Sequence, residues 1–451
     1  MNHDCAVVVG ACAQISPPVF GERCFALLLI HMSVVAHYQL TDQFDCYTPL
    51  TTVIPVSRCR SFRYLLQPTT RQRRLLERLL HNQCELYNAA LQERRGAWSW
   101  ERRSVSYIDQ CRTLTELRDI RPEVLAHGVT VCRGTLKRLD RAFCAFYRRC
   151  RSAETPGFPR FKSPRRFDSL QWEDSSGWRL HIERRRLSLL GVGALKVRLH
   201  RALRGTPKAI TIAREGRRWF LTVRCTEVPA EPLPPTGRSV GVDLGVRAQI
   251  ATSDGLVLGE GRYGRRAAKR LVHAQQVLGP KRRGSHRRKR AVERVAKAHR
   301  KVRDQRRDLA HKLSRQLVHD YDLIVHEDLA IKGMVRRPAP RPNEKGGFDP
   351  NGARAKSGLN RSIYDAGWRE LLSFIAYKAE EAGRMVIAVD PRHTSQRCSL
   401  CGHVAAENRH SQAEFRCLAC GHLAHADVNA AINILRAGRA HQAPACAGLP
   451  N

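Results

Sequence analysis

The chain has 451 residues, which is enough for roughly two to four domains with substantial cores. It carries 79 Lys and Arg against 41 Asp and Glu, a formal net charge of +38. Such a field favours a polyanionic partner, with nucleic acid the first candidate and an anionic membrane surface the second. The sequence contains no apolar run of about twenty residues, the length that a helix needs to cross a bilayer, and it therefore predicts no transmembrane helix.

Residues 1–57 carry no pattern that predicts an element, and we treat them as an N-terminal extension of unknown role. Recognisable sequence patterns begin at residue 58, and residues 60–66 predict a strand that ends before Pro68. Apolar residues at helical spacing then predict an amphipathic helix, and arginine-rich helical text continues to about Arg151. We interpret this stretch as a helical domain.

A short break at 155–164 places Phe158 and Phe161 among prolines and basic residues. Aromatic rings interleaved with cations can stack on nucleobases while the cations hold phosphates. A loop that packs against the helices would explain the same residues equally well, so both interpretations stay open.

Several short strand-like segments follow, and together with the first strand they predict a small β-barrel of the OB kind. The segments are 180–182, 187–190, 195–199, 209–212 and 219–223. The proline-rich segment 229–235 then predicts a domain linker.

The second half opens with a buried-strand pattern at 238–245 that carries Asp243, and Asp254-Gly255 predicts a hairpin turn soon after it. Residues 262–307 are rich in Lys and Arg and nearly free of acids, and we expect one long basic helix there. Its apolar stripe would be Val292, Val295, Val302, Leu309, Leu313 and Leu317. A solvated basic face is the alternative explanation for any single arginine.

A second buried-strand pattern at 323–329 carries Glu327 and Asp328 near its end. The remaining expected elements are a mobile loop at 336–358, a helix over 361–382, a strand over 385–390 and a short last helix over 427–436. The tail after Gly438 has little structural signal.

Only four of the sixteen cysteines have the spacing of a metal site. Cys398 and Cys401 form one C-x2-C pair, and Cys417 and Cys420 form a second after a gap of fifteen residues. Four thiolates on two tight turns are typical of a structural zinc ribbon, and the glycine after each pair suits such a turn. Asp427 follows the last cysteine at the start of a helix, which indicates a ribbon inserted into a catalytic domain. A free-standing zinc hairpin with a solvated aspartate is the alternative.

Asp243, Glu327 and Asp427 lie at the ends of three separate predicted elements. In a ribonuclease H-like sheet the first strand and the neighbouring fourth strand each carry an acid, and a late helix supplies the third. Three such carboxylates can hold two Mg²⁺ ions, of which one activates a water and the other stabilises the leaving oxygen of a phosphodiester. Each acid alone can be explained as a solvated strand end, and Asp427 as a helix N-cap.

Four segments resemble the TnpB family, the transposon-associated OrfB proteins to which the miniature type V CRISPR effectors are related. They are Gly-Val-Asp-Leu-Gly at 241–245, His-Glu-Asp-Leu-Ala-Ile-Lys-Gly-Met at 326–334, Thr-Ser-Gln-Arg-Cys-Ser-Leu-Cys-Gly at 394–402 and Asp-Val-Asn-Ala-Ala-Ile-Asn-Ile-Leu at 427–435. Residues 360–383 also resemble the segment before the family's ribbon, whereas 62–69 and 157–163 match the N-terminal half more weakly.

The resemblance implies a multidomain α+β and α/β protein that cleaves DNA as an RNA-guided, Mg²⁺-dependent endonuclease next to a short flanking motif. By motif match, Asp243, Glu327 and Asp427 would be the catalytic carboxylates of a RuvC site with two Mg²⁺ ions. The four cysteines would hold one structural Zn²⁺ ion. The implied partners are a guide RNA and a double-stranded and single-stranded DNA target, without a membrane. We expect a cytoplasmic bacterial protein that is associated with the nucleoid when bound to DNA.

The resemblance also implies a division into domains. These are the extension at 1–57, a wedge barrel at 58–70 and 156–230, a helical recognition domain at 71–155, a linker at 231–237, a RuvC-like nuclease domain at 238–395 and 425–437, a zinc ribbon that binds target nucleic acid at 396–424, and a tail at 438–451.

One departure from the family pattern lies beside the third acid. The family commonly carries Asp-Arg-Asp where this chain has His425, Ala426 and Asp427. The third acid is kept and the arginine is absent. An RNA-guided DNA-binding protein, or a regulator of transposition or transcription with weak or no cleavage, is therefore the alternative function.

Overall fold

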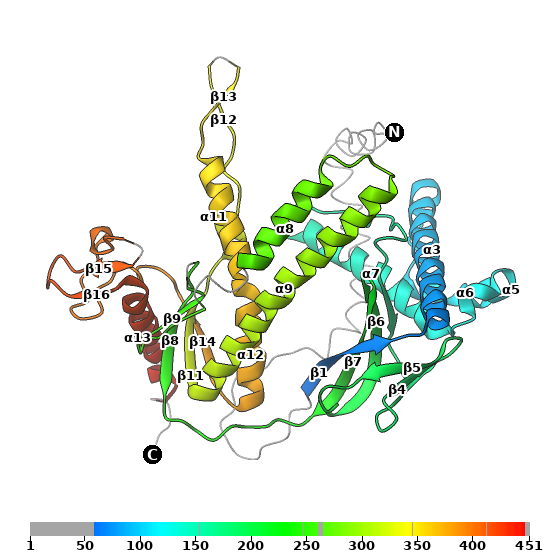
Figure 1. Ribbon diagram of the computed structural model, residues 1–451, viewed down its shortest axis with the longest axis horizontal. Coiled ribbons are helices and arrows are strands. Elements are labelled where there is room, and N and C mark those ends of the chain that lie inside the picture. Colours follow the sequence, from blue (N-terminus) through cyan, green and yellow to red (C-terminus); the bar gives the residue numbers. More distant parts are fainter. Residues whose placement is uncertain are drawn as a thin grey trace. The chain divides into compact units, whose positions relative to one another are not determined.

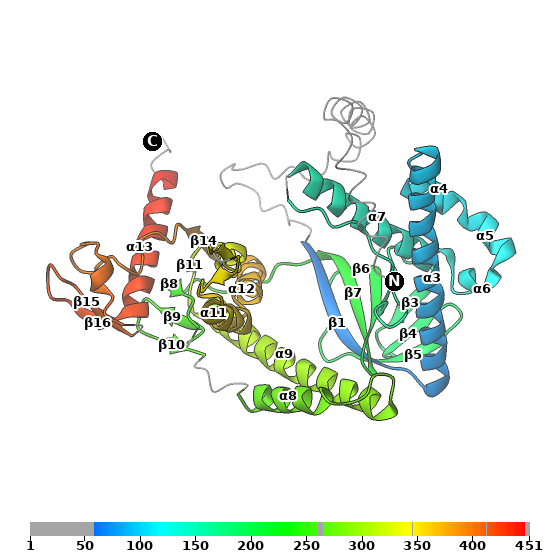
Figure 2. The ribbon, with the colours of Figure 1, turned by 90° about the horizontal axis from the view of Figure 1, so that it is seen from above.

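The computed structural model describes residues 58–152, 154–246, 248–259, 265–344, 346–411 and 413–446 (Figures 1 and 2). The extension at 1–57 lies outside these residues, as do the last five residues of the tail. In this part of the chain, no helix combines the length and the apolar character needed to cross a bilayer.

The N-terminal half is built on one seven-stranded antiparallel sheet with the order β2-β6-β7-β1-β5-β4-β3. The strands are β1 (Arg58–Gln67), β2 (Ser169–Trp172), β3 (Trp178–His181), β4 (Arg186–Leu189), β5 (Gly193–Arg198), β6 (Thr206–Glu215) and β7 (Arg218–Val228). The predicted strands are confirmed, and β2 was missed. The described edge strands β2 and β3 are not hydrogen-bonded to each other, so a closed barrel stays a prediction.

Five helices precede or follow these strands and supply the other side of the same core. They are α3 (Thr70–Glu101), α4 (Tyr107–Arg112), α5 (Leu114–Ile120), α6 (Pro122–Leu125) and α7 (Val129–Arg151). A capping box between Thr69 and Gln72 starts α3. A Cβ at Gly134 would lie 2.1 Å from the backbone oxygen of Gln171, so only glycine lets α7 lie directly on β2.

The C-terminal half contains a five-stranded mixed sheet with the order β10-β9-β8-β11-β14. The strands are β8 (Ser239–Asp243), β9 (Ile250–Thr252), β10 (Val257–Leu258), β11 (Leu323–Glu327) and β14 (Met385–Val389). Strand β11 runs parallel to both β8 and β14, with His326 opposite Val242. The first and fourth strands are therefore neighbours, and their carboxyl ends, which carry Asp243 and Glu327, lie at one edge.

The long basic helix predicted over 262–307 is instead two helices, α8 (Arg265–Leu278) and α9 (His286–Asp320), which lie side by side (Figure 2). Gly279 and Pro280 end α8, and Ser285 restarts the helix by accepting a hydrogen bond from the Arg288 amide at 3.1 Å. The predicted stripe holds toward the C-terminal end of α9. It fails at Val292, which is exposed, while Ala291 next to it is buried.

Two further expectations also need correction. The loop predicted at 336–358 contains a short hairpin of β12 (Arg341–Pro342) and β13 (Phe348–Asp349). The helix predicted over 361–382 is divided into α11 (Ala353–Ala366) and α12 (Trp368–Ala382). Gly367 ends the first and precedes the second in a left-handed conformation, with a φ of 66°, and this breaks the helical hydrogen bonds.

The last helix, α13 (Ala426–Cys446), lies against β8 and β11 (Figure 1) and is longer than predicted. A Cβ at Gly241 would lie 2.0 Å from the Ala431 oxygen, and one at Gly438 would lie 2.4 Å from a methyl of Val325. Gly438 therefore provides close contact with the sheet and does not end the helix, so α13 continues through the predicted tail to Cys446.

The linker before β8 is fixed to the C-terminal half by a buried arginine. Arg384 donates to Asp322 at 2.5 Å and to the Pro234 oxygen at 2.7 Å, and its side chain is only 3% exposed. Asp322 also accepts hydrogen bonds from the backbone amides of Thr236 and Gly237. The linker is thus held at its end by one charged network.

This network yields a first prediction. Replacing Arg384 with methionine leaves the Pro234 oxygen without its donor and Asp322 without its cation. Because hydrogen bonds of charged groups are each worth roughly 1.5–3 kcal/mol, we expect amides in β8 and β11 to exchange at least about tenfold faster in hydrogen-exchange mass spectrometry. Arg392→Met is the control, since Arg392 is 83% exposed and its ion pair with Asp390 is loose. Equal exchange in both variants would contradict the network.

Candidate metal centre and acidic site

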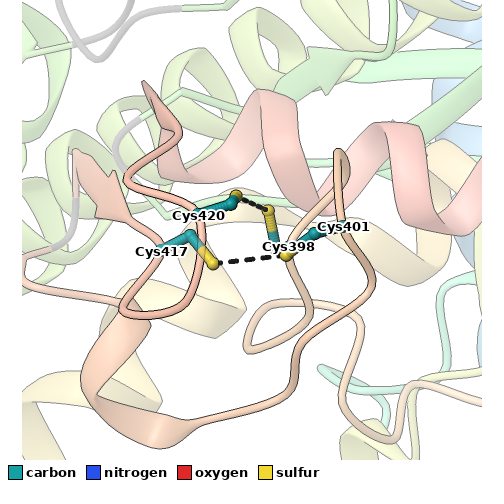
Figure 3. Close-up of side chains that lie close together, drawn as sticks. All are labelled: Cys398, Cys401, Cys417 and Cys420. Atoms are coloured by element: carbon teal, nitrogen blue, oxygen red, sulfur yellow. Dashed lines mark hydrogen bonds between the residues drawn. The ribbon is translucent and has the colours of Figure 1, made fainter.

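The four predicted metal cysteines converge in space although they come from two separate turns (Figure 3). Their sulfur atoms all lie within 4.8 Å of one another, with 3.7 Å between Cys398 and Cys420 and 3.5 Å between Cys401 and Cys417. For Zn–S bonds of about 2.3 Å, a regular tetrahedron requires sulfur separations of roughly 3.8 Å. The set therefore fits a tetrahedral zinc ion.

The two turns that carry the cysteines have the same hydrogen bonds. The amides of Gly402 and Gly421 donate to the oxygens of Cys398 and Cys417, each at 3.0 Å. Both glycines have a positive φ, 79° and 73°, as the predicted sharp turns require. Behind them, the short strands β15 (Glu414–Arg416) and β16 (Leu423–His425) pair and lead directly into α13.

Backbone amides aimed at Cys417 already favour its thiolate. Burial opposes ionisation of this thiol, but hydrogen bonds from the amides of Cys420 and Ala419 outweigh it and lower the pKa of Cys417 to about 6. A thiolate is the form that binds zinc, so the turn geometry suits a metal ligand.

The zinc hypothesis yields a second prediction. The purified chain should contain one zinc ion per molecule by inductively coupled plasma mass spectrometry, and Cys417→Ser should lose it because three thiolates leave the tetrahedron open. Cys150→Ser is the control, since this exposed cysteine of α7 lies far along the chain from the cluster. Full zinc content in the Cys417→Ser protein would contradict the assignment.

The three predicted acids come from three elements that meet at one edge of the C-terminal sheet. Asp243 ends β8, Glu327 ends the neighbouring β11, and Asp427 lies in the first turn of α13, which packs on both strands. They do not form a second group as tight as the cysteines, since in the described part of the chain only the cysteines converge within 4.8 Å. Their charges nevertheless act on one another.

Asp243 has a strongly perturbed carboxyl group. Burial raises its pKa to about 7, and the charges of Glu327 and Asp427 add to the effect. Burial likewise raises the pKa of Glu327, while the Thr394 hydroxyl, which donates to it at 2.5 Å, acts in the opposite direction. Crowded, half-buried carboxylates are costly without a cation, which is the electrostatic condition of a site for hard divalent metals.

Arg409 lies in this acidic site and was missed in the sequence. It belongs to the ribbon, donates to Asp427 at 2.8 Å, and its positive charge lowers the pKa of both Asp243 and Glu327. A single arginine in a long loop gives no signal in the sequence, because only the folded ribbon brings it over the sheet edge.

Two asparagines of α13 attach the ribbon to this edge. Asn429 accepts from the Ser399 amide at 2.9 Å and donates to the Arg397 oxygen at 2.8 Å, and Asn433 donates to the oxygens of Thr394 and Arg397. Their spacing of four places them on one face of the helix, directly after Asp427. That spacing is a signal the sequence contains, although the predictions assigned no role to it.

The perturbed carboxyl group yields a third prediction. The folded pKa of Asp243, about 7, lies above the unfolded value of about 3.9, so the free energy of unfolding falls as the pH rises between these values. Asp243→Asn removes this penalty. In magnesium-free buffer at pH 8 we expect the variant to have a higher Tm than the wild type, with a free energy of unfolding larger by up to about 4 kcal/mol. At pH 4 the two proteins should melt at the same temperature.

Asp254→Asn is the matched control with the opposite sign. Burial raises the pKa of Asp254, but hydrogen bonds from Thr252 and Tyr321 outweigh it and lower the pKa overall. Its contribution is present above the unfolded pKa and lost in acid, so this variant should melt below the wild type at neutral pH. A Tm difference for Asp243→Asn that is the same at pH 4 and pH 8 would contradict the assignment.

Two family descriptions match parts of the chain. Residues 222–337 match "Probable transposase", and residues 368–434 match "Cas12f1-like, TNB domain". The first covers β8 and β11 with their acids, and the second covers the four cysteines and Asp427.

Relatives that match more than two thirds of the chain agree with these matches. The putative RNA-guided DNA endonuclease InsQ of Escherichia coli K12 is 36% identical over 306 residues, which cover 68% of this chain and 73% of the relative. A putative RNA-guided DNA endonuclease of Streptomyces pristinaespiralis is 32% identical over 393 residues, or 85% and 90% of the two chains. The solved Cas12f1–sgRNA–target DNA complex has a similar fold, with a TM-score of 0.53, 14% identity, and coverage of 84% of this chain and 98% of the other.

Proposed function

Because the chain belongs to the TnpB family of transposon-associated OrfB proteins, which is related to the miniature type V CRISPR effectors, we propose that it is an RNA-guided DNA endonuclease. Asp243, Glu327 and Asp427 would be its catalytic carboxylates, in a RuvC-type domain of ribonuclease H-like topology. The observation that carries the proposal is the meeting of three carboxylates at one sheet edge, where burial, together with the charges of Glu327 and Asp427, raises the pKa of Asp243 to about 7.

The donor set supports divalent metal at this edge. It consists of carboxylate oxygens, the ligands Mg²⁺ prefers, and their mutual repulsion falls when a cation binds. Two Mg²⁺ ions there would supply an activated water and stabilise the leaving oxygen of the phosphodiester. The chain's own residues prepare the site. Thr394 fixes the Glu327 carboxyl group, the backbone amide of Leu244 donates to Asp243, and α13 brings Asp427 to the strand ends.

Arg409 bears on the alternative function. The missing arginine at Ala426 suggested a guided binder with little cleavage, but a guanidinium group still lies 2.8 Å from Asp427, supplied by the ribbon. A fixed cation beside the carboxylates can stabilise the extra negative charge of the transition state. We therefore favour the endonuclease over the guided binding protein.

The rest of the chain would hold the nucleic acids. In the proposed division, 58–70 with 156–230 is the wedge barrel and 71–155 is the recognition domain. The nuclease domain is 238–395 with 425–437, and the zinc ribbon, 396–424, binds target nucleic acid. Base pairing with the guide would select the target, and the protein would hold the heteroduplex through its phosphates and read only a short flanking motif. A net charge of +38 suits that task.

The proposal yields a fourth prediction. Purified protein with its copurified guide RNA should cut matched double-stranded DNA in Mg²⁺, and Asp243→Ala should bind the same DNA while cutting at least about a thousandfold more slowly, because it cannot hold the metals. Gel electrophoresis of labelled DNA measures cleavage, and gel shift measures binding.

Asp365→Ala is the matched control, since this exposed acid of α11 pairs with Arg306 and is not one of the three carboxylates. It should cut as fast as the wild type. Tight binding without cleavage by the wild type would favour the guided binding protein instead, and equal cleavage by wild type and Asp243→Ala would overturn the site assignment.

A further inference from the structure

The loop at 155–164 is held by hydrogen bonds at Lys162 and is only partly packed against the helices. The Asn88 side chain on α3 clamps its backbone, accepting from the Lys162 amide and donating to the Lys162 oxygen, both at 2.8 Å. Phe161, the next residue, stays 47% exposed, and Phe158 stays 46% exposed. The loop backbone is thus held at Lys162 while both rings stay partly exposed to solvent.

The two rings belong to a larger aromatic cluster. Phe158 packs edge-on against Phe143 and Phe146 of α7, with ring centroids 5.6 and 5.3 Å apart. Tyr147 extends the cluster, 5.4 Å from Phe146, and is itself 47% exposed. Monomeric proteins bury aromatic rings where they can, so three half-exposed rings on a fixed scaffold indicate a binding surface.

Cations surround these rings. The Arg95 guanidinium lies over the Phe161 ring at 5.4 Å, and that of Arg94 lies over Phe143 at 5.0 Å. Arg94 is only 8% exposed, donates to Gln110, and has one terminal nitrogen without a hydrogen-bond partner in the described part of the chain. The loop itself adds the exposed cations Arg160 and Lys162. Rings for stacking on bases and cations for holding phosphates are the two components of a site for a single strand.

We propose that Phe158, Phe161 and Tyr147, with Arg95, form a stacking platform for an unpaired segment of RNA. The proposal rests on the proposed function, because a guided nuclease must hold its RNA before it meets a target. Duplexes hide the faces of their bases, so exposed rings favour a single strand. We choose RNA over DNA because, in the proposed function, the RNA is bound before any DNA target is met, and a net charge of +38 favours a polyanion that stays bound.

The test is fluorescence anisotropy with the full-length protein and a labelled oligouridylate RNA of about 12 nucleotides. Stacking on one ring is worth about 1–3 kcal/mol, so Phe161→Leu should weaken binding by roughly 5- to 150-fold, whereas Phe161→Trp should bind as well as the wild type. Arg95→Gln should lower the slope of log affinity against log salt by about 0.7.

Controls separate the platform from general effects. Tyr364→Leu removes a ring of α11 that is 65% exposed and should leave RNA binding unchanged. Phe158→Leu removes a ring that also packs against Phe143 and Phe146. A loss of RNA binding in this variant is therefore interpreted only together with an unchanged Tm. Unaltered binding in Phe161→Leu, an equal loss on double-stranded RNA, or a larger loss on oligothymidylate DNA than on RNA would overturn the proposal. The assay contains no cleavage step, so loss of DNA cutting alone would count against the endonuclease and not against the platform.

Discussion

The close packing of α13 on the C-terminal sheet is the constraint on which the rest of the site depends. Gly241 and Gly438 let the helix backbone approach β8 and β11 to distances that no side chain would allow. This contact carries Asp427 to the strand ends and, through Asn429 and Asn433, attaches the ribbon to the same edge. The cysteine cluster, the three acids and Arg409 are therefore one assembly, although they are spread over some two hundred residues of sequence.

The charges of this assembly do not balance, because three carboxylates meet a single arginine. Burial, together with the charges of Glu327 and Asp427, raises the pKa of Asp243 to about 7, and Arg409 offsets only part of this effect. Such an arrangement lowers the stability of the folded protein, and sites of this kind are usually functional for that reason. Hard cations would remove the repulsion, whereas the four sulfur ligands of the cysteine cluster would suit a softer ion. One end of α13 thus links two sites with different chemistry.

The arginines of the chain differ in what surrounds them. Along α9, Arg303, Arg306 and Arg307 pair with carboxylates of other elements and help hold the fold. By contrast, Arg95 lies over an exposed ring, where its charge remains available to a ligand. The net charge alone indicates a polyanion, whereas our proposal for a single strand depends on the positions of the exposed rings and of the cations that lie over them.

The sequence by itself determined the elements with strong local signals. Alternating and buried strand patterns predicted β8, β11 and β14, and the cysteine spacing predicted the converging cluster, because both depend on residues close together in the chain. The breaks at Gly279-Pro280 and Gly367 were also visible there and were overlooked. Only the tertiary structure decided that Arg409 lies beside Asp427, that Gly438 continues a helix, and that the rings of 155–164 remain exposed. These features depend on contacts between residues distant in sequence, and no local pattern encodes such contacts.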